Sequence, residues 1–229
     1  MSSKNVIKYN KASRYKSPWR AAVRFVLQRG ILKPIIYAIL NVKVEGKENL
    51  QKLGSKPFIL VANHSSHLDV LLCTFSLPWA RAKSLAAAAA SDYWMDKFWP
   101  REFTRSFLNT FPVDRNGKNR YGGLSSRLLE TGVSLVIFPE GTRSRTGKLG
   151  DFNPGSAALS IRHNVPILPV TLHGTYRAWP AGKSVLYIVR CPRPRVTVSF
   201  GVPIYPDNLT VEQLNKKLKT TIEKSLKQK

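Results

Sequence analysis

The sequence predicts an α/β fold in which a mostly parallel central sheet is flanked by helices and preceded by an N-terminal amphipathic pair of helices. Three short apolar runs, at residues 58–62, 134–138 and 167–172, each end abruptly in polar residues. The runs are continuous rather than alternating, which is typical of strands that helices cover on both faces. The chain has 229 residues, 43% of them hydrophobic, which suits a single domain with a full core.

The N-terminal region predicts two helices after a polar arm. Residues 1–16 are basic and lack an apolar period, so we expect a flexible arm there. Pro18 stands where the first residue of a helix is expected, and Gly30 is expected to end that helix. Pro34 begins a second, short apolar helix, so we expect residues 17–45 to form a helical pair. The apolar face of the first helix carries Ala22, Val23, Val26 and Leu27.

The three apolar runs predict where a site lies. The first leads into Asn63 and His64, the second into residues 139–141, and the third into residues 173–174. Because parallel α/β sheets bind ligands at the carboxyl ends of their strands, we expect all three polar clusters at one edge of the sheet. Residues 46–229 then form one domain around that edge.

Four further segments complete the expected domain. Residues 85–90 are an alanine-rich segment, and residues 121–130 predict a helix that ends near Gly132. Residues 196–200 alternate like a half-exposed edge strand. A capping box at residues 210–213 begins a final helix, because a threonine and a glutamine three positions apart satisfy each other's backbone N–H groups. Its apolar face is expected to carry Leu214, Leu218, Ile222 and Leu226.

Composition narrows the classes of partner. Lysine and arginine number 37 against 13 acidic residues, a net charge of +24 that attracts nucleic acid, lipid headgroups or an acidic protein. Two cysteines are too few for a disulfide scaffold and favour a reducing compartment. No run approaches the ~18 apolar residues of a spanning helix, and no signal-peptide pattern begins the chain. We expect no transmembrane segment, which leaves binding to a membrane surface open.

The first polar cluster predicts a general base. His64 and Asp69 are five positions apart and would point about 140° away from each other on one helix, so a strand-to-helix turn must bring them together. If it does, the carboxylate fixes the imidazole tautomer and the other ring nitrogen takes a proton from a hydroxyl. No nucleophile accompanies the pair, so the proton would come from a substrate alcohol.

Two other interpretations of this cluster remain open. His64, His67 and Asp69 are acceptable metal ligands, but the other two histidines lie in unrelated segments and the ligand count disfavours a metal. Alternatively, residues 63–66 form a polar turn that satisfies backbone groups after a strand, and the histidines are incidental.

Two turns that carry an arginine predict a phosphate-bearing substrate. Each turn begins with a phenylalanine–proline pair and carries an arginine a few positions later; the two segments are residues 111–117 (FPVDRNG) and 138–144 (FPEGTRS). Arg115 and Arg143 present planar forks that match phosphate oxygens, and Glu140 could align a polyol or hold an arginine.

Two hydrolase classes are disfavoured. Residues 141–148 (GTRSRTGK) resemble a P-loop, but five residues rather than four separate the glycines, and Leu149 replaces the serine or threonine. No G-x-S-x-G nucleophile elbow occurs in the chain, which disfavours a serine esterase.

Four motifs resemble those of the glycerolipid acyltransferases, which include the lysophosphatidic acid acyltransferases. Residues 63–69 match the H-x-x-x-x-D motif, residues 113–115 the second motif, residues 138–143 the third, and residues 165–169 the V-P-x-x-P motif, in the family's order. The resemblance implies transfer of an acyl group from an acyl-CoA or acyl-carrier-protein thioester to a lysophospholipid hydroxyl, converting 1-acylglycerol-3-phosphate to phosphatidic acid. Glycerol-3-phosphate or another lysolipid is the alternative acceptor.

The same resemblance assigns the site residues. His64 is the implied general base and Asp69 its orienting partner, with no metal and no cofactor beyond the thioester co-substrate. The implied substrate-binding residues are Arg115, Glu140, Gly141, Thr142 and Arg143.

The resemblance also implies a membrane. Family members carry an N-terminal two-helix element that dips into one leaflet, which is similar to the expected helices of residues 17–42. We therefore expect a peripheral or monotopic protein on the cytoplasmic face of a membrane. Arg20, Arg24, Arg29 and Lys33 are expected to contact anionic headgroups, at about 1 kcal/mol each. A basic nucleic-acid-binding protein is the rival class, but carboxylates at the expected site repel phosphate backbones, so no nucleic acid is expected; an inactive scaffold is the third possibility.

Overall fold

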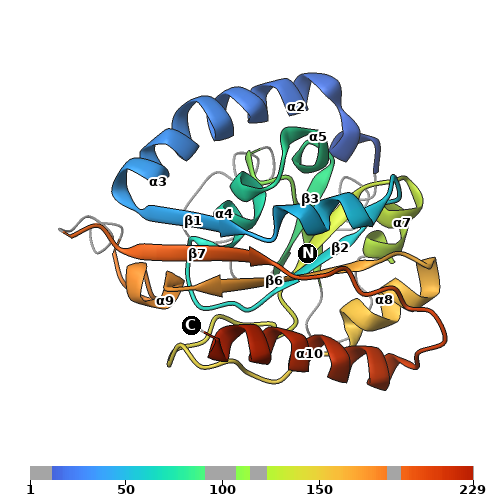
Figure 1. Ribbon diagram of the computed structural model, residues 1–229. Helices are drawn as coiled ribbons and strands as arrows, with labels where there is room; N and C mark the ends of the chain where they lie inside the picture. The colour runs from blue at the N-terminus through green and yellow to red at the C-terminus, as the bar shows by residue number, and fades with distance from the viewer. Residues whose placement is uncertain (1–11, 91–106, 114–122, 185–191, 229) are drawn as a thin grey trace.

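A computed structural model describes residues 12–90, 107–113, 123–184 and 192–228. Within these residues the strands form one seven-stranded sheet with the order β1-β7-β6-β2-β5-β3-β4 (Figure 1). The strands are β1 (Asn41–Glu45), β2 (Ile59–Ala62), β3 (Leu85–Ala90), β4 (Thr110–Val113), β5 (Ser134–Ile137), β6 (Ile167–His173) and β7 (Arg195–Phe200).

The sheet is mostly parallel, as predicted. The three expected strands lie side by side, with β2 between β5 and β6, and Leu60 pairs with both Val136 and Leu168. The alanine-rich segment is strand β3, which pairs parallel with β4 and β5. Only the pairing of β6 with β7 is antiparallel among the described strands. The carboxyl ends of β2, β5 and β6 therefore share one edge.

The expectation that residues 196–200 form an edge strand is wrong. Strand β7 lies between β6 and β1, and β1 comes from residues 41–45, which were expected to belong to the helical pair. The alternating burial of β7 has another cause, because Val196 and Val198 face the core while Thr197 and Ser199 are only half-buried. The burial along β7 alternates because one face of the strand packs in the core and the other is only partly covered, and not because the strand lies at an edge.

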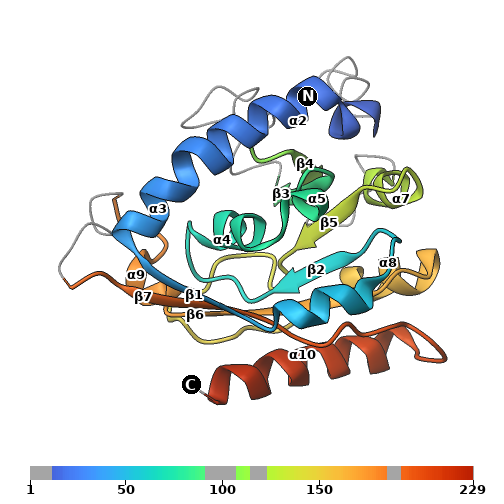
Figure 2. The same ribbon diagram turned by 45° about the horizontal axis from the view of Figure 1, so that its top comes forward.

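Two hydrophobic clusters occupy the two faces of the sheet. Leu60 and Ala62 of β2 pack with α4 (Asp69–Ser76) on one face, whereas Ile59 and Val61 belong to the cluster on the other. Figures 1 and 2 show the N-terminal helices, α4 and α5 (Trp79–Ala82) on one side of the sheet and α10 (Val211–Lys227) on the other. The remaining helices are η3 (Lys47–Leu53), α7 (Leu124–Glu130), α8 (Gly155–His163) and α9 (Thr175–Ala178).

The N-terminal helices form one continuous arch and are not interrupted at Gly30 (Figure 1). The arch consists of α2 (Pro18–Phe25), the π-helical η2 (Val26–Leu32) and α3 (Lys33–Ile39). Gly30 was expected to end the first helix, but it does not adopt the positive φ that ends a helix. Lys33 N–H donates to Gln28 O, five residues back, directly before Pro34, which has no N–H to donate. The wider turn thus carries the helix past the proline.

The inner side of this arch carries polar side chains along α2 and η2, whereas Ile36 of α3 packs into the core. Arg24, only 2% exposed, donates to Lys83 O at 2.8 Å, and Arg29 donates to Phe75 O at 2.7 Å. Lys33 also donates to Phe75 O, at 3.0 Å. The expectation that Arg24 contacts lipid headgroups is therefore wrong, because Arg24 is buried. Arg29 and Lys33 are half-buried and bond to backbone carbonyls of the domain, and for them and Arg20 the expectation stays a prediction.

Six large apolar side chains of the arch are exposed: Trp19, Val23, Phe25, Val26, Ile31 and Ile35. The Phe25 ring also packs edge-on against Trp79, with centroids 5.1 Å apart.

The two chain ends differ in how well the sequence predicted them. Residues 12–16 were expected to belong to a flexible arm of residues 1–16, but they form η1 (Ala12–Lys16) and bury Tyr15 in the core. Residues 1–11 lie outside the described part. At the other end the predicted capping box is confirmed, because Thr210 Oγ1 accepts from Gln213 N–H and Gln213 Oε1 accepts from Thr210 N–H.

Candidate active site

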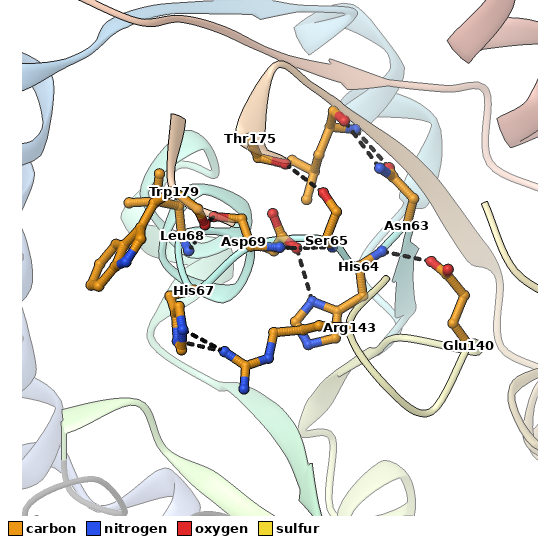
Figure 3. Close-up of polar contacts among 12 residues, drawn as sticks. Asn63, His64, Ser65, His67, Leu68, Asp69, Glu140, Arg143, Thr175 and Trp179 are labelled. Carbon is orange, nitrogen blue, oxygen red and sulfur yellow. Dashed lines mark hydrogen bonds and ion pairs between the residues drawn. The ribbon is translucent and has the colours of Figure 1, made fainter. Parts of the chain in front are cut away.

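The turn between β2 and α4 brings the predicted histidine and aspartate together. The strand ends at Ala62 and the helix begins at Asp69, so the chain reverses direction between them. His64 Nδ1 lies 2.8 Å from Asp69 Oδ2 (Figure 3). The Asp69 side chain is fully buried, whereas the His64 side chain keeps 18% of its surface exposed. The contact predicted from the spacing is thus present, with the carboxylate inside and the imidazole at the surface.

Asp69 is held by three hydrogen bonds to one oxygen. Besides the imidazole, Oδ2 accepts from the backbone N–H groups of Ser65 at 2.7 Å and Ser66 at 2.8 Å. Asp69 also opens α4, where the positive end of the helix dipole favours a carboxylate. Within the described residues the Nε2 atom of His64 has no hydrogen-bond partner, so it is the ring nitrogen available to a substrate.

The chain after β5 surrounds His64. The Phe138 ring stacks on the imidazole, with centroids 4.0 Å apart and planes 19° apart. His64 N–H donates to Glu140 Oε1 at 2.7 Å, and His64 O accepts from Ser144 N–H at 2.7 Å. The other oxygen of Glu140 accepts from Gly150 N–H at 2.9 Å. Burial raises the pKa of the Glu140 carboxyl above its ordinary value, while these two N–H groups act in the opposite direction.

Arg143 reaches the same edge and meets His67. Its Nη1 lies 2.5 Å from His67 Nδ1 and 2.8 Å from Nε2 (Figure 3). Burial, and then the charge of Arg143, lower the pKa of His67 to about 4. A neutral imidazole accepts a hydrogen bond from the guanidinium without repelling it. The His67 ring also packs against Trp179, with centroids 4.9 Å apart, so Arg143 has a fixed partner.

The geometry bears on the metal interpretation. His67 contacts Arg143, and the His64 ring makes its hydrogen bond to Asp69. In the part of the chain that the structure describes, no three His, Cys, Asp or Glu side chains gather as metal ligands. The expectation that the site needs no metal or cofactor stays a prediction.

Hydrogen bonds join the turn after β2 to the end of β6 and to α9. Asn63 Nδ2 donates to Leu172 O at 3.0 Å, and Asn63 Oδ1 accepts from Leu172 N–H at 2.8 Å. Ser65 Oγ lies 3.1 Å from Thr175 Oγ1. Asn63 thus satisfies backbone groups, as the polar-turn interpretation expects, while His64 of the same turn contacts Asp69. Sequence reasoning missed Thr175, although its place just after a strand end was a usable signal.

Of the remaining predicted site residues, the structure describes Gly141 and Thr142. Arg115 lies outside the described residues. Gly141 adopts a φ of +71°, and a Cβ there would lie 3.3 Å from Asn153 Nδ2, so the turn favours glycine. Thr142 is exposed next to it. The structure thus brings His64, Asp69, Glu140 and Arg143 together at one edge.

The fold and the site define a class of protein: an α/β domain with a carboxylate-held histidine and an arginine turn at the carboxyl edge of its sheet. A family model described as Acyltransferase matches residues 41–173. The chain therefore belongs to the acyltransferase family. The match begins at Asn41, the first residue of β1. The family model therefore includes residues 41–45, which were expected to belong to the helical pair.

Curated relatives carry one name. The chain is 30% identical over 186 residues to a 1-acyl-sn-glycerol-3-phosphate acyltransferase of Limnanthes douglasii, covering 79% of this chain and 60% of that protein. It is 27% identical over 172 residues to the Pseudomonas aeruginosa protein of that name, covering 71% and 62%. The chain thus spans less than two thirds of the length of these relatives.

A solved structure shows the same fold. The 1-acyl-sn-glycerophosphate acyltransferase PlsC of Thermotoga maritima superimposes with a TM-score of 0.68 at 24% identity, covering 91% of this chain and 81% of that one. The predicted α/β class is therefore confirmed.

Proposed function

We propose that this protein transfers a fatty acyl group from an acyl-CoA or acyl-carrier-protein thioester to the free hydroxyl of 1-acylglycerol-3-phosphate, giving phosphatidic acid. The observation that carries the proposal is the contact between His64 and the buried Asp69, beside an arginine, at the carboxyl edge of the sheet. The names of the curated relatives support this acceptor.

His64 acts as the general base in the proposed reaction. Its Nε2 takes the hydroxyl proton as the alcohol oxygen attacks the thioester carbonyl, and Asp69 holds the tautomer and stabilises the imidazolium. The tetrahedral intermediate collapses, the carbon–sulfur bond breaks, and the thiolate takes the proton back from the imidazolium. A thioester is already activated, so no covalent enzyme intermediate is required. Base catalysis of this kind contributes about 10²–10⁴-fold.

Arg143 binds the acceptor phosphate in this proposal. Its guanidinium is charged, lies beside the His64 turn and is held by neutral His67. A planar fork pairs with two phosphate oxygens. Arg115 and the backbone around Gly141 and Thr142 remain proposed contributors to the same subsite.

The outer side of the N-terminal arch is the proposed membrane surface. Six large apolar side chains of the arch, between Trp19 and Ile35, are exposed, with Val26 58% exposed. Exposed apolar patches of this kind mark interaction surfaces. No described helix is both long and apolar enough to cross a bilayer, so the arch would lie in the headgroup region of one leaflet. We propose the cytoplasmic leaflet, where anionic headgroups attract the +24 charge of the chain.

Acyl transfer is tested with purified protein, labelled acyl-CoA or acyl-carrier protein, and a panel of acceptors that differ in headgroup. We expect transfer to 1-acylglycerol-3-phosphate above glycerol-3-phosphate and above neutral lysolipids. His64→Ala should abolish transfer without loss of folding. A preference for another acceptor, or activity retained without the imidazole, would contradict the proposal.

Membrane binding is tested separately by flotation with vesicles of anionic and of neutral lipid. Val26→Glu combined with Ile35→Glu places two charges on the outer side of the arch and should abolish flotation with both. Val202→Glu is the matched control, because this apolar residue is also exposed but lies elsewhere. Unchanged flotation of the double variant would place the membrane surface elsewhere.

A further inference from the structure

We propose that Glu140 is a positioning residue that holds the backbone of His64 and links the base to the Arg143 turn, instead of binding the acceptor. The inference rests on the proposed function, because it names how the same site is kept in register. It departs from the resemblance, which places Glu140 among the substrate-binding residues.

Both oxygens of the Glu140 carboxylate already have protein partners. Oε1 accepts from His64 N–H at 2.7 Å (Figure 3). Oε2 accepts from Gly150 N–H at 2.9 Å. A carboxylate donates no hydrogen bond when ionised, so it offers nothing to phosphate oxygens and repels them. The acceptor phosphate is therefore better served by Arg143, and Glu140 is better explained by its backbone partners.

The residue that Glu140 holds is the base itself. His64 is fixed from both sides of its backbone, because its N–H meets Glu140 and its carbonyl meets Ser144 N–H at 2.7 Å. Phe138 stacks on its ring. Residues 138–144 thus set the position of the His64 backbone, while Asp69 sets the direction of its imidazole.

Glu140 also closes the turn that carries the arginine. Asn153 donates to Pro139 O through its backbone N–H and its side-chain amide, both at 2.9 Å. The bond from Gly150 to Glu140 is a second closure of the same loop. A Cβ on Gly150 would lie 3.2 Å from Oε2, so the loop passes close against the carboxylate. Arg143 lies within this closed loop, so one carboxylate fixes the arginine and the histidine relative to each other.

Steady-state kinetics separate positioning from substrate binding. In Glu140→Ala, two backbone N–H groups lose their acceptor and the base shifts. A misplacement of about 1 Å can cost about 10²-fold, so we expect kcat to fall about 10²-fold and, because the Arg143 turn loosens as well, the acceptor KM to rise by a smaller factor. Glu140→Gln keeps one acceptor oxygen and should lose less. A KM that rises for phosphate-bearing acceptors, with kcat unchanged, would overturn the proposal and support a substrate contact.

Asp151→Asn is the matched control. It removes a carboxylate from the same loop, but Asp151 is exposed and, among the residues that the structure describes, pairs only with Lys219, at 2.7 Å. We expect wild-type kcat from this variant. A kcat loss equal to that of Glu140→Gln would show that loop charge, and not the contact with His64, matters, and would refute the proposal.

A measurement that needs no catalysis tests the positioning role separately from the proposed function. The chain has four histidines, so ¹⁵N-histidine NMR gives a simple spectrum in which His64→Ala assigns the His64 signals. We expect Glu140→Gln to shift the His64 ring resonances, and Asp151→Asn to leave them unchanged. Gly150→Ala, which keeps the charge but crowds Oε2, should shift them as well. Unchanged His64 resonances in Glu140→Gln and Gly150→Ala would refute the positioning role, even for a protein that transfers no acyl group.

Discussion

Replacing Asp69 with asparagine tests the proposed base most directly. The side chain is fully buried, and its Oδ2 accepts three hydrogen bonds, from the His64 ring and from the N–H groups of Ser65 and Ser66. Asparagine has nearly the same shape but carries no charge, so Asp69→Asn removes electrostatic support while it preserves packing.

The expected magnitudes follow from these contacts. A hydrogen bond to a charged group contributes about 1.5–3 kcal/mol and a neutral one about 0.5–1.5 kcal/mol, so each of the two backbone bonds weakens by about 1 kcal/mol. We expect the free energy of unfolding to fall by about 2 kcal/mol. The imidazolium loses its partner and the tautomer is no longer fixed, which in comparable triads costs about 10⁴-fold. We expect kcat to fall about 10³–10⁴-fold, or about 4–5 kcal/mol of transition-state stabilisation.

Two assays check the two magnitudes. Thiol release from acyl-CoA in the presence of acceptor measures kcat, and urea unfolding at neutral pH measures stability. A variant that keeps more than a third of the wild-type kcat would refute the reasoning, because the base would then work without its carboxylate. A stability loss well above 2 kcal/mol with an intact rate would assign Asp69 to folding alone.

Three further predictions concern stability and pH. The pKa of His67 is lowered to about 4 in the folded protein against an ordinary 6.5, so the unfolded chain takes up the His67 proton at a higher pH than the folded protein does. The urea concentration at the unfolding midpoint should therefore decrease as the pH falls from 6.5 to 4. The decrease should be smaller in His67→Asn, which lacks the titrating imidazole. Gly174→Ala should prevent stable folding, measured by circular dichroism, because Gly174 has a φ of +77° and a Cβ would lie 2.2 Å from Arg195 O; a native spectrum would contradict this. Leu218→Ala in α10 should lower the free energy of unfolding by about 2–5 kcal/mol in urea titration, because Leu218 is fully buried, and a loss below 1 kcal/mol would show that the site collapses around the cavity.

The sequence predicted the elements that local rules determine. The three buried strands, their shared edge and the capping box at Thr210 follow from apolar runs and capping chemistry, which act over a few residues. The contact of His64 with Asp69 followed from spacing once a turn was assumed. These features needed no knowledge of distant partners.

The errors arose where distant contacts override local rules. β1 was hidden at the end of a helical segment, because only its pairing with β7 makes residues 41–45 a strand. Gly30 stays helical because the arch lies against the domain, and the arginines beneath it bond to carbonyls far along the chain. The two backbone partners of Glu140 were equally invisible, since spacing along the chain carries no information on what a carboxylate meets in the fold.

The polar underside of the N-terminal arch constrains how the enzyme would sit on lipid. Arg29 bonds to Thr74 O, Phe75 O and Leu77 O at the end of α4, the same helix that begins with Asp69. The N-terminal arch and the His64 turn are therefore joined through the two turns of α4. A docked molecule would hold its imidazole at a fixed height above the bilayer, so the lysolipid headgroup must rise to meet it.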